Sequence, residues 1–287
     1  MWLILSIATA VFLALRDLQV KRYALSLDFL TLSWGLYLFS SSILLIPVLV
    51  YGIPDISGQY FYALFIAGSC DAIAALLYVQ SLKSGDLSKA IPMMSFIPVF
   101  QLFIAPVVLS EYPSLMGVAG VFIVVAGAYL INISKGTDSL FGPFYGLLRD
   151  RSCQMMLGVA LLWSISIVYH KIGVQSSSNY FWVFSVTVYI GVVLYPLVHI
   201  FAGQPWKKIA THSRNLVLPA VFHALTLGAL YGAIALAHVA YVSSIRRLSI
   251  LISIFFGVFL LKEENLGQKL IGGSIMVAGA VIISMVN

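Results

Sequence analysis

Residues 109–130 read LSEYPSLMGVAGVFIVVAGAYL, and residues 261–282 read LKEENLGQKLIGGSIMVAGAVI. When the two segments are aligned at a constant offset of 152, eight of 22 positions are identical without a gap. The identities include the block Val-Ala-Gly-Ala at 125–128 and 277–280, and Glu111 falls on Glu263. Agreement of this length is not expected by chance, so we predict that the chain contains an internal repeat.

The composition is typical of a protein embedded in lipid. Of the 287 residues, 61% are hydrophobic and 9% are charged, whereas a soluble domain carries about 25% charged residues. The net charge of +6 does not indicate a nucleic-acid partner, because the basic residues lie between apolar runs and no nucleic-acid-binding motif is present. The two cysteines, Cys70 and Cys153, make neither a disulfide framework nor a metal site. We predict a multi-pass protein of the cell (plasma) membrane without a cofactor or a metal.

Ten apolar runs are long enough to cross a bilayer, because about 20 helical residues span about 30 Å of hydrocarbon. They are 2–20, 31–51, 60–82, 88–109, 113–132, 153–171, 180–202, 215–236, 240–261 and 266–286. The long connection 133–152 separates a first repeat at 1–132 from a second at 153–287. An odd number of spans per repeat inverts the second half. The predicted fold class is an all-α membrane protein with ten transmembrane helices in two inverted five-helix repeats.

The glycines of the repeated segment have a predicted packing role. Gly117, Gly120 and Gly127 fall along one helix face, as do Gly272 and Gly279. Small residues let helix backbones approach closely in lipid. We therefore expect the fifth and tenth spans to pack against other helices, away from the substrate.

The basic residues also predict an orientation. Thirteen of the 16 Lys and Arg residues flank odd-numbered connections between spans. The positive-inside rule then places those connections in the cytoplasm and both termini outside.

The sequence resembles EamA-type members of the drug/metabolite transporter superfamily over its whole length. The resemblance is carried by VVLSEYPSLMGVAGVFIVVAGAYL, by GVFLLKEENLGQKLIGGSIMVAGAV and by ALRDLQVKRY at 14–23. In addition, YVSSIRRLSILISIFFGVFLLKEEN is similar to members whose ninth helix opens with Ser-x-Lys/Arg-Arg-x-Ser. The resemblance implies a central cavity lined mainly by helices 1, 3, 4, 6, 8 and 9, with export or exchange of small metabolites.

Two adjacent arginines, Arg246 and Arg247, lie inside the span 240–261. An arginine at the bilayer centre costs about 3 kcal/mol on translocon scales, and an intramembrane charge marks a substrate pathway by default. On one continuous helix, Arg246 shares a face with Ser249 and Ser253, and we predict that this face lines a wet cavity. The alternative is that one arginine snorkels to the membrane surface while the other pairs with an acid.

Asp71 is the acid nearest the middle of any predicted span. Its carboxyl group is interpreted as a site for a proton or a substrate amine. The alternative is a structural partner of an arginine, or a protonated acid hydrogen-bonded to a neighbour. The two roles are compatible, because a substrate can break an ion pair. We hypothesise that the arginines hold an anionic group of the substrate, with Asp71 as their resting partner.

Several other polar and aromatic side chains are candidates for the cavity wall. His223 and Tyr231 are alternatively residues of the aromatic belt at the membrane surface, and Lys171 is expected to snorkel. The full set predicted to bind substrate is Arg246, Arg247, Asp71, Tyr78, Trp34, Tyr37, His170, His223, Tyr231 and Ser249.

The predicted function is that of a secondary transporter that moves an amino-acid-like or anionic metabolite by alternating access, in export or exchange. No P-loop is present, so ATP drive within the chain is not expected. An intramembrane enzyme is the first alternative, but H-E-x-x-H and G-x-S-x-G are absent, and no catalytic residue is predicted. A channel is the second, but no repeated filter motif is visible. The predicted partners are a small-molecule substrate and the lipid bilayer, and a homodimer is left open.

Overall fold

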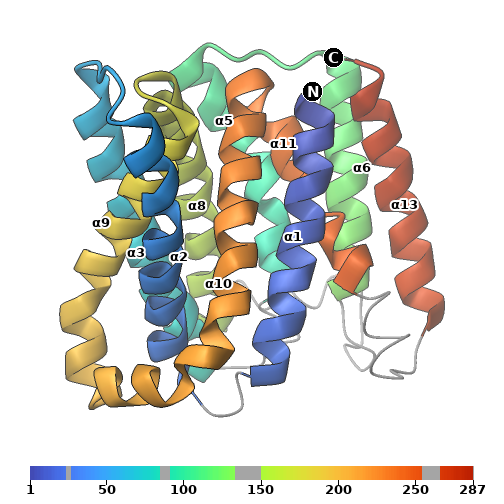
Figure 1. The fold of residues 1–287 in the computed structure, drawn as a ribbon. Helices are drawn as coiled ribbons and strands as arrows, with labels where there is room; N and C mark the ends of the chain where they lie inside the picture. Colours follow the sequence, from blue (N-terminus) through green and yellow to red (C-terminus); the bar gives the residue numbers. More distant parts are fainter. Residues whose placement is uncertain (24–26, 85–90, 133–149, 254–265, 287) are drawn as a thin grey trace.

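The computed structural model describes residues 1–23, 27–84, 91–132, 150–253 and 266–286, and within these ranges every regular element is helical. The elements of the first half are α1 (Trp2–Tyr23), α2 (Phe29–Tyr51), α3 (Gln59–Ser84), η2 (Ile91–Phe96), α5 (Ile97–Leu109) and α6 (Leu115–Asn132). Those of the second half are α8 (Arg151–Gln175), α9 (Asn179–Ala202), α10 (Pro205–Leu236), α11 (Val239–Arg246) and α13 (Leu266–Ser284). The long helices run side by side, and both termini lie at the same end of the bundle (Figure 1).

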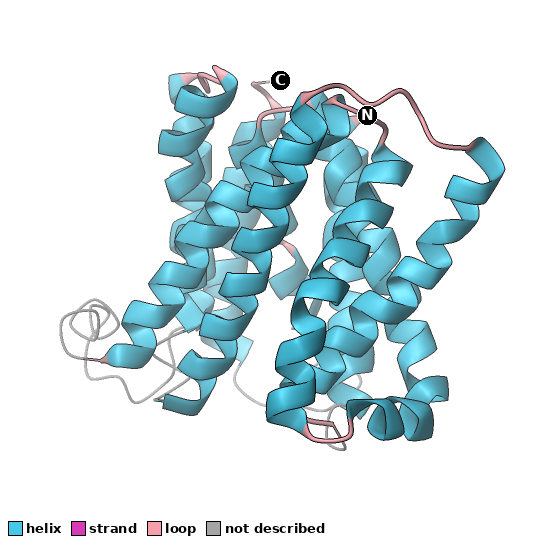
Figure 2. Cartoon of the chain, turned by 90° about the vertical axis from the view of Figure 1, so that its left-hand side faces the viewer, coloured by secondary structure: helices cyan, strands magenta, loops and turns pink. Residues whose placement is uncertain are grey.

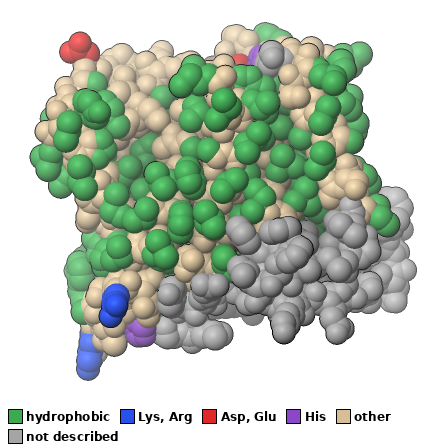
Figure 3. Space-filling view, turned by 45° about the vertical axis from the view of Figure 1, so that its right-hand side comes forward, with side chains coloured by type: hydrophobic (Ala, Val, Ile, Leu, Met, Phe, Trp, Pro, Cys, Tyr) green, Lys and Arg blue, Asp and Glu red, His purple; other side chains and the backbone are tan. Residues whose placement is uncertain are grey.

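Six of the described helices, α1, α2, α3, α8, α9 and α10, are long and apolar enough to cross a membrane. Their outward side chains include large apolar residues such as Leu49, Phe65 and Val192, each more than 60% exposed. In the space-filling view, apolar side chains cover most of the visible surface, whereas the Lys and Arg residues in view lie at its lower edge (Figure 3). Such a surface suits contact with lipid, and the chain is a multi-pass integral membrane protein.

The main helix pairs take one member from each half of the chain. α1 packs against α10, α3 against α8, α2 against α9, and α6 against α13. In Figure 1, α1 lies beside α10 and α6 beside α13, and Figure 2 shows the same bundle of helices turned by 90°. The largest apolar cluster accordingly joins α2, α3, α8, α9 and α10.

Reciprocal glycine contacts fix the crossing of α6 and α13. A Cβ on Gly127 would lie 2.6 Å from the carbonyl oxygen of Gly272, and a Cβ on Gly272 would lie 2.8 Å from that of Gly127. Gly120 and Gly279 face each other in the same way, at 3.1 and 2.8 Å. Only glycine permits such an approach, so α6 and α13 are packing helices, as the repeat predicts.

The span containing the two arginines is interrupted. α11 ends at Arg246, a turn follows at 247–248, and helix resumes at 249. The amide of Arg247 donates to Ser244 O at 3.0 Å and that of Leu248 to Ile245 O at 2.9 Å, which tightens the chain from α-helical to 3₁₀ spacing. The expectation of one continuous helix from 240 to 261 is therefore wrong, and residues 254–261 lie outside the described ranges.

A second irregular segment lies at the equivalent position of the first repeat. At the offset of 152, η2 at 91–96 falls on 243–248, the segment that contains the turn. η2 contains Pro92, which lacks an amide hydrogen and disrupts the α-helical pattern. The two halves thus share an interrupted helix at equivalent positions, one with a proline and one with two arginines.

α10 begins at Pro205, ten residues before the predicted start of its span. Its first turns lie across the end of the bundle opposite the termini before the helix enters it (Figure 1). The hydropathy pattern missed this start because Lys207, Lys208 and Arg214 are polar. These polar residues can be part of the helix because they lie at the rim of the bundle.

Candidate functional site

A buried hydrogen-bond cluster centres on His170 of α8. Its Nε2 lies 2.9 Å from Asp71 Oδ2, 2.9 Å from Ser166 Oγ and 3.1 Å from the Tyr231 hydroxyl. Its Nδ1 accepts a hydrogen bond from Trp182 Nε1 at 3.2 Å. The rings of His170 and Tyr231 are stacked, with centroids 4.4 Å apart. The cluster therefore joins α3, α8, α9 and α10 around one imidazole.

The Trp182 contact fixes the tautomer of His170. An indole nitrogen is a donor only, so Nδ1 must present its lone pair and the imidazole proton must reside on Nε2. Nε2–H then donates to Asp71, whose side chain is 13% exposed. His170 is neutral in this arrangement, and it donates one hydrogen bond to the Asp71 carboxyl.

A second polar group joins α1, α2 and α10. Arg16 Nη1 lies 3.3 Å from His223 Nδ1, and its Nε and Nη2 donate to Asp17 Oδ1 at 2.9 and 2.7 Å. The ring of Tyr37 packs edge-on against His223, with centroids 5.2 Å apart. Because arginine only donates, His223 carries its proton on Nε2. That nitrogen is buried and has no hydrogen-bond partner within the described residues, so it offers a donor to a bound molecule.

Arg246 connects the two groups electrostatically. Its guanidinium interacts with the charges of Arg16, Asp17 and Asp71 and with the hydroxyl of Tyr231. Tyr37 and Tyr231 in turn interact with Asp71 and Arg246. We call this set the central cluster: Arg16, Asp17, Tyr37, Asp71, His170, His223, Tyr231 and Arg246.

The expected resting pair between Asp71 and the arginines is not the arrangement observed. Asp71 is hydrogen-bonded to His170, and no described carboxylate lies within 4.0 Å of either arginine. Arg247 instead donates through Nη2 to Met94 O of η2 at 2.8 Å. The turn after Arg246 accounts for this separation, because it turns Arg247 toward η2 while Arg246 keeps its place in the central cluster.

Tyr78 lies beside the central cluster. Its ring packs near Trp163 of α8, with centroids 6.0 Å apart. Its hydroxyl interacts with the charges of Arg16 and Asp17. Tyr78 therefore extends the cluster along α3.

Trp34 lies elsewhere. It donates through Nε1 to Gly191 O at 2.9 Å and packs edge-on against Trp206 at 4.7 Å, so it belongs to the interface of α2 with α9 and α10. Ser249 is buried just after the turn that ends α11. The structure thus brings most of the predicted substrate residues together, with Trp34 apart and Arg247 facing η2.

Sequence reasoning missed one buried pair. Lys171 Nζ donates to Glu111 Oε1 and, at 2.7 Å, to Ala237 O. Lys171 was expected to snorkel, but it is 9% exposed and Glu111 is 8% exposed. The repeat marks Glu111 through its identity with Glu263, which lies outside the described ranges. Its partner could not be found in the sequence, because Lys171 belongs to the other half.

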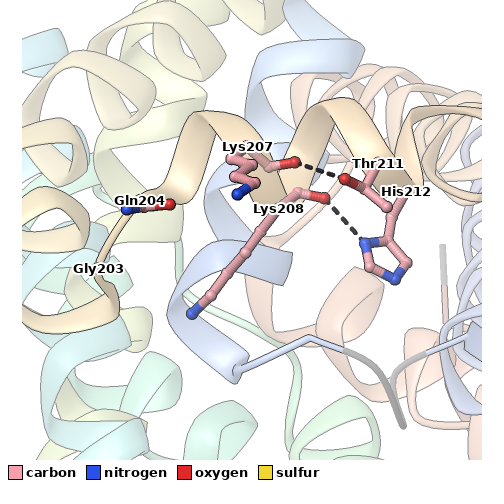
Figure 4. A pocket seen from close by; sticks show the side chains of 6 residues that line it. All are labelled: Gly203, Gln204, Lys207, Lys208, Thr211 and His212. Atoms are coloured by element: carbon pink, nitrogen blue, oxygen red, sulfur yellow. Dashed lines mark hydrogen bonds between the residues drawn. The ribbon is translucent and has the colours of Figure 1, made fainter.

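Two surface pockets lie away from the central cluster. One of about 520 Å³, near the end with the termini, is lined by residues of α3, α5 and α8, including Gln59, Leu109 and Tyr169. The other, of about 300 Å³, surrounds the first turns of α10, where Lys207 and Lys208 project (Figure 4). Neither has the converging charges of the central cluster.

The second pocket adjoins a surface ion pair. Lys208 Nζ donates to Asp28 Oδ2 at 2.9 Å, and Asp28 caps α2 by accepting from Thr31 N at 2.9 Å. Burial acts to raise the pKa of the Asp28 carboxyl, but the hydrogen bonds from Thr31 and Lys208 outweigh it and lower the pKa below its ordinary value.

Comparison with known proteins agrees with this architecture. The model of the EamA-like transporter family matches residues 1–133 and 151–285. No curated protein matches. A solved chain, described only as the crystal structure of a protein, superposes with a TM-score of 0.74 over 99% of this chain and 97% of its own, at 12% identity. At that identity the likeness shows a shared fold alone.

Proposed function

The chain belongs to the EamA-like transporter family, and from this membership we propose that it carries a small anionic or amino-acid-like metabolite across the membrane by alternating access. The proposal includes ten spans in two inverted repeats, a substrate site in the central cluster, and export or exchange across the plasma membrane. It places both termini outside, because most basic residues flank the connections at the other end.

The proposed substrate class rests on the charged residues of the central cluster. Arg246 lies among the charges of the central cluster, and no described carboxylate lies within 4.0 Å of its guanidinium. A charge buried in low dielectric needs a compensating charge. A monoanionic group of the substrate supplies it at Arg246, and the free donor of His223 Nε2 adds a hydrogen bond.

Asp71 supports the amino-acid-like form of the substrate. Its Oδ2 accepts from the neutral His170, and the structure gives its Oδ1 no hydrogen-bond partner among the described residues. An ammonium group can donate to that oxygen. A zwitterion would then place its carboxylate on Arg246 and its ammonium on Asp71.

Alternating access is supported by the arrangement of the halves. Each main helix pair joins one half to the other, so a rocking of the halves changes the exposure of the residues between them. η2 and the turn after α11 provide irregular backbone at equivalent positions of both repeats. Interrupted helices of this kind are typical of transporter substrate sites.

Ligand-induced thermal stabilisation of the purified protein tests the proposal. Pooled metabolites are followed by matched sets: an apolar amino acid, the same compound without its amine, and the same compound without its carboxylate. A ligand that binds the folded state raises the melting temperature by mass action. We expect compounds with a carboxylate to stabilise the wild type, and the folded Arg246→Gln variant to lose the effect.

Lys207→Gln is the matched control, because it also removes one positive charge but at the exposed start of α10. It should keep the wild-type response. Arg247→Gln should show a smaller loss than Arg246→Gln, since Arg247 faces η2. Equal stabilisation of the wild type and the Arg246→Gln variant would reject the assignment of the anion site to Arg246.

A further inference from the structure

The contacts of Glu111 join the two halves at the end of the bundle that carries both termini. Glu111 lies in the connection between α5 and α6 and accepts from Lys171 of α8. Its second oxygen, Oε2, accepts from the backbone amide of Val239, the first residue of α11, at 2.9 Å. His238 Nδ1 lies 3.6 Å from the same oxygen. One carboxylate from the first half thus accepts hydrogen bonds from two residues of the second half and lies close to a third.

Both charges of this pair are buried inside the protein. Glu111 is 8% exposed and Lys171 is 9% exposed. Lys171 has a further acceptor in Ala237 O, in the connection between α10 and α11, at 2.7 Å. Each charge therefore depends largely on the other for compensation, because only about a tenth of either side chain is exposed.

The pair stands between the central cluster and that end of the molecule. Val239 and Arg246 are the two ends of α11, and a rise of 1.5 Å per residue separates them by roughly 10 Å. Lys171 directly follows His170, which binds Asp71. The ion pair therefore lies about two helical turns away from Arg246, on the side of the termini.

A neighbouring contact between the same segments reinforces the closure. The amide of Ser114, at the start of α6, donates to the Tyr241 hydroxyl at 3.1 Å. A Cβ on Gly117 would lie 1.9 Å from that hydroxyl, so Tyr241 of α11 sits directly on the α6 backbone. The contacts of Val239 with Glu111 and of Tyr241 with Ser114 and Gly117 must break if α11 moves away from the α5–α6 connection.

We propose that Glu111 and Lys171 form the gate that closes the substrate pathway toward the end carrying the termini. The pair stabilises the conformation described here, and its separation opens the central cluster to that side. When the gate opens, water hydrates the carboxylate and the ammonium, so neither charge is left without a partner. The inference rests on the proposed transport function, and it assigns Glu111 and Lys171 as positioning residues of the transport cycle.

The test measures access to the centre from each side without any substrate. Ser243, a buried residue of α11, is replaced by cysteine in a protein carrying Cys70→Ser and Cys153→Ala. Vesicles of both orientations are treated with a membrane-impermeant maleimide, and a tag on a terminus identifies the side that carries the termini. In the parent, we expect the cysteine at 243 to react more slowly from that side than from the other.

Glu111→Gln should raise the labelling rate from the side of the termini by about tenfold, because removal of the gate shifts the population toward the conformation open to that side. Glu111→Gln leaves Lys171 buried without a counter-charge. The double variant Glu111→Gln with Lys171→Met is therefore measured beside it, since it removes both charges. The double variant should show the same increase.

Asp55→Asn is the matched control, because Asp55 is an exposed acid in the connection between α2 and α3, at the same end of the bundle. Its labelling should equal that of the parent. An unchanged rate in both gate variants would overturn the proposal, even if their melting temperatures fall, because the pair would then be purely structural. Failure of every metabolite to bind would affect the proposed function but not this result.

Discussion

His170 determines how much charge the centre of the bundle holds. A doubly protonated imidazole would pair with Asp71 and cancel its charge, whereas the neutral ring only donates to it. The donor of Trp182 occupies Nδ1 at 3.2 Å and so selects the neutral ring with its proton on Nε2. A tryptophan on α9 thereby determines which nitrogen of His170 donates to an aspartate on α3.

This assignment predicts a single tautomer. In protein labelled with ¹⁵N-histidine, the His170 ring should show a proton on Nε2 and none on Nδ1 near neutral pH. Trp182→Phe should populate both tautomers and cost about 1–3 kcal/mol of stability, because Nδ1 becomes a buried acceptor without a donor. Trp163→Phe, on the same helix as His170 but without a hydrogen bond to its ring, is the control. Protons on both nitrogens in the wild type would contradict the assignment.

The carboxyl of Asp28, at the end of the bundle opposite the termini, is predicted to make a pH-dependent contribution to stability. Because hydrogen bonds from Thr31 and Lys208 lower its pKa in the folded state, the unfolded state binds the proton more tightly. The stabilisation by Asp28 is then fully present above the unfolded pKa of about 4 and is lost as the pH falls through the folded pKa. Asp28→Asn should melt below the wild type at pH 7, and this difference should shrink on acidification below pH of about 4. A difference that does not depend on pH would rule out this origin.

Helix packing shows which parts of the fold a sequence can specify. The glycines of α6 and α13 could be identified from the repeat because their spacing is local and periodic. The end of α11 at Arg246 could not, because no proline or glycine marks it and the acceptor of Arg247, Met94 O, lies in the other half. Local sequence patterns therefore predict helices and their packing faces. They do not predict a helix break that depends on an acceptor far away in the sequence.

The glycine crossing gives a prediction for α6. Gly127→Ala places a methyl group 2.6 Å from Gly272 O, which forces the backbones apart and should destabilise the protein by about 1–3 kcal/mol, as overpacking does. Gly228→Ala on α10 is the matched control, because a Cβ there meets no atom within 4 Å. Alanine is the better helix former, so this control should be neutral or slightly stabilising. Thermal unfolding in detergent compares the two, and equal melting temperatures would contradict the close approach.

The whole bundle depends on pairing between the halves. α1 with α10, α3 with α8, α2 with α9, and α6 with α13 each join the first half to the second. The membrane character, the repeat and most of the central cluster follow from the sequence. The pairing of Asp71 with His170 and of Glu111 with Lys171 does not, because charge alone allows several partners and only the packed helices select one.

Separate expression of the halves tests this dependence. Residues 1–132 and 151–287, produced as two chains in the same cell, should copurify through an affinity tag on either one. Each half produced alone should be degraded, because the small-residue faces that contact the other half are left without their packing partner. Recovery of either half alone as a stable, folded protein would contradict the argument.

The reciprocal contacts of Gly120 with Gly279 and of Gly127 with Gly272 also allow the single chain to be compared with a pair of identical chains. Two identical chains inserted in opposite orientations would form this crossing by themselves. The same two glycines of each chain would then make both contacts. Such a symmetric pair would also carry every other feature in duplicate, including four central arginines. In the fused chain the positions of Arg246 and Arg247 correspond to Met94 and Ser95 at the offset of 152. The single chain therefore carries the two cations in one half only, and the other half supplies the backbone carbonyl of Met94 that binds one of them.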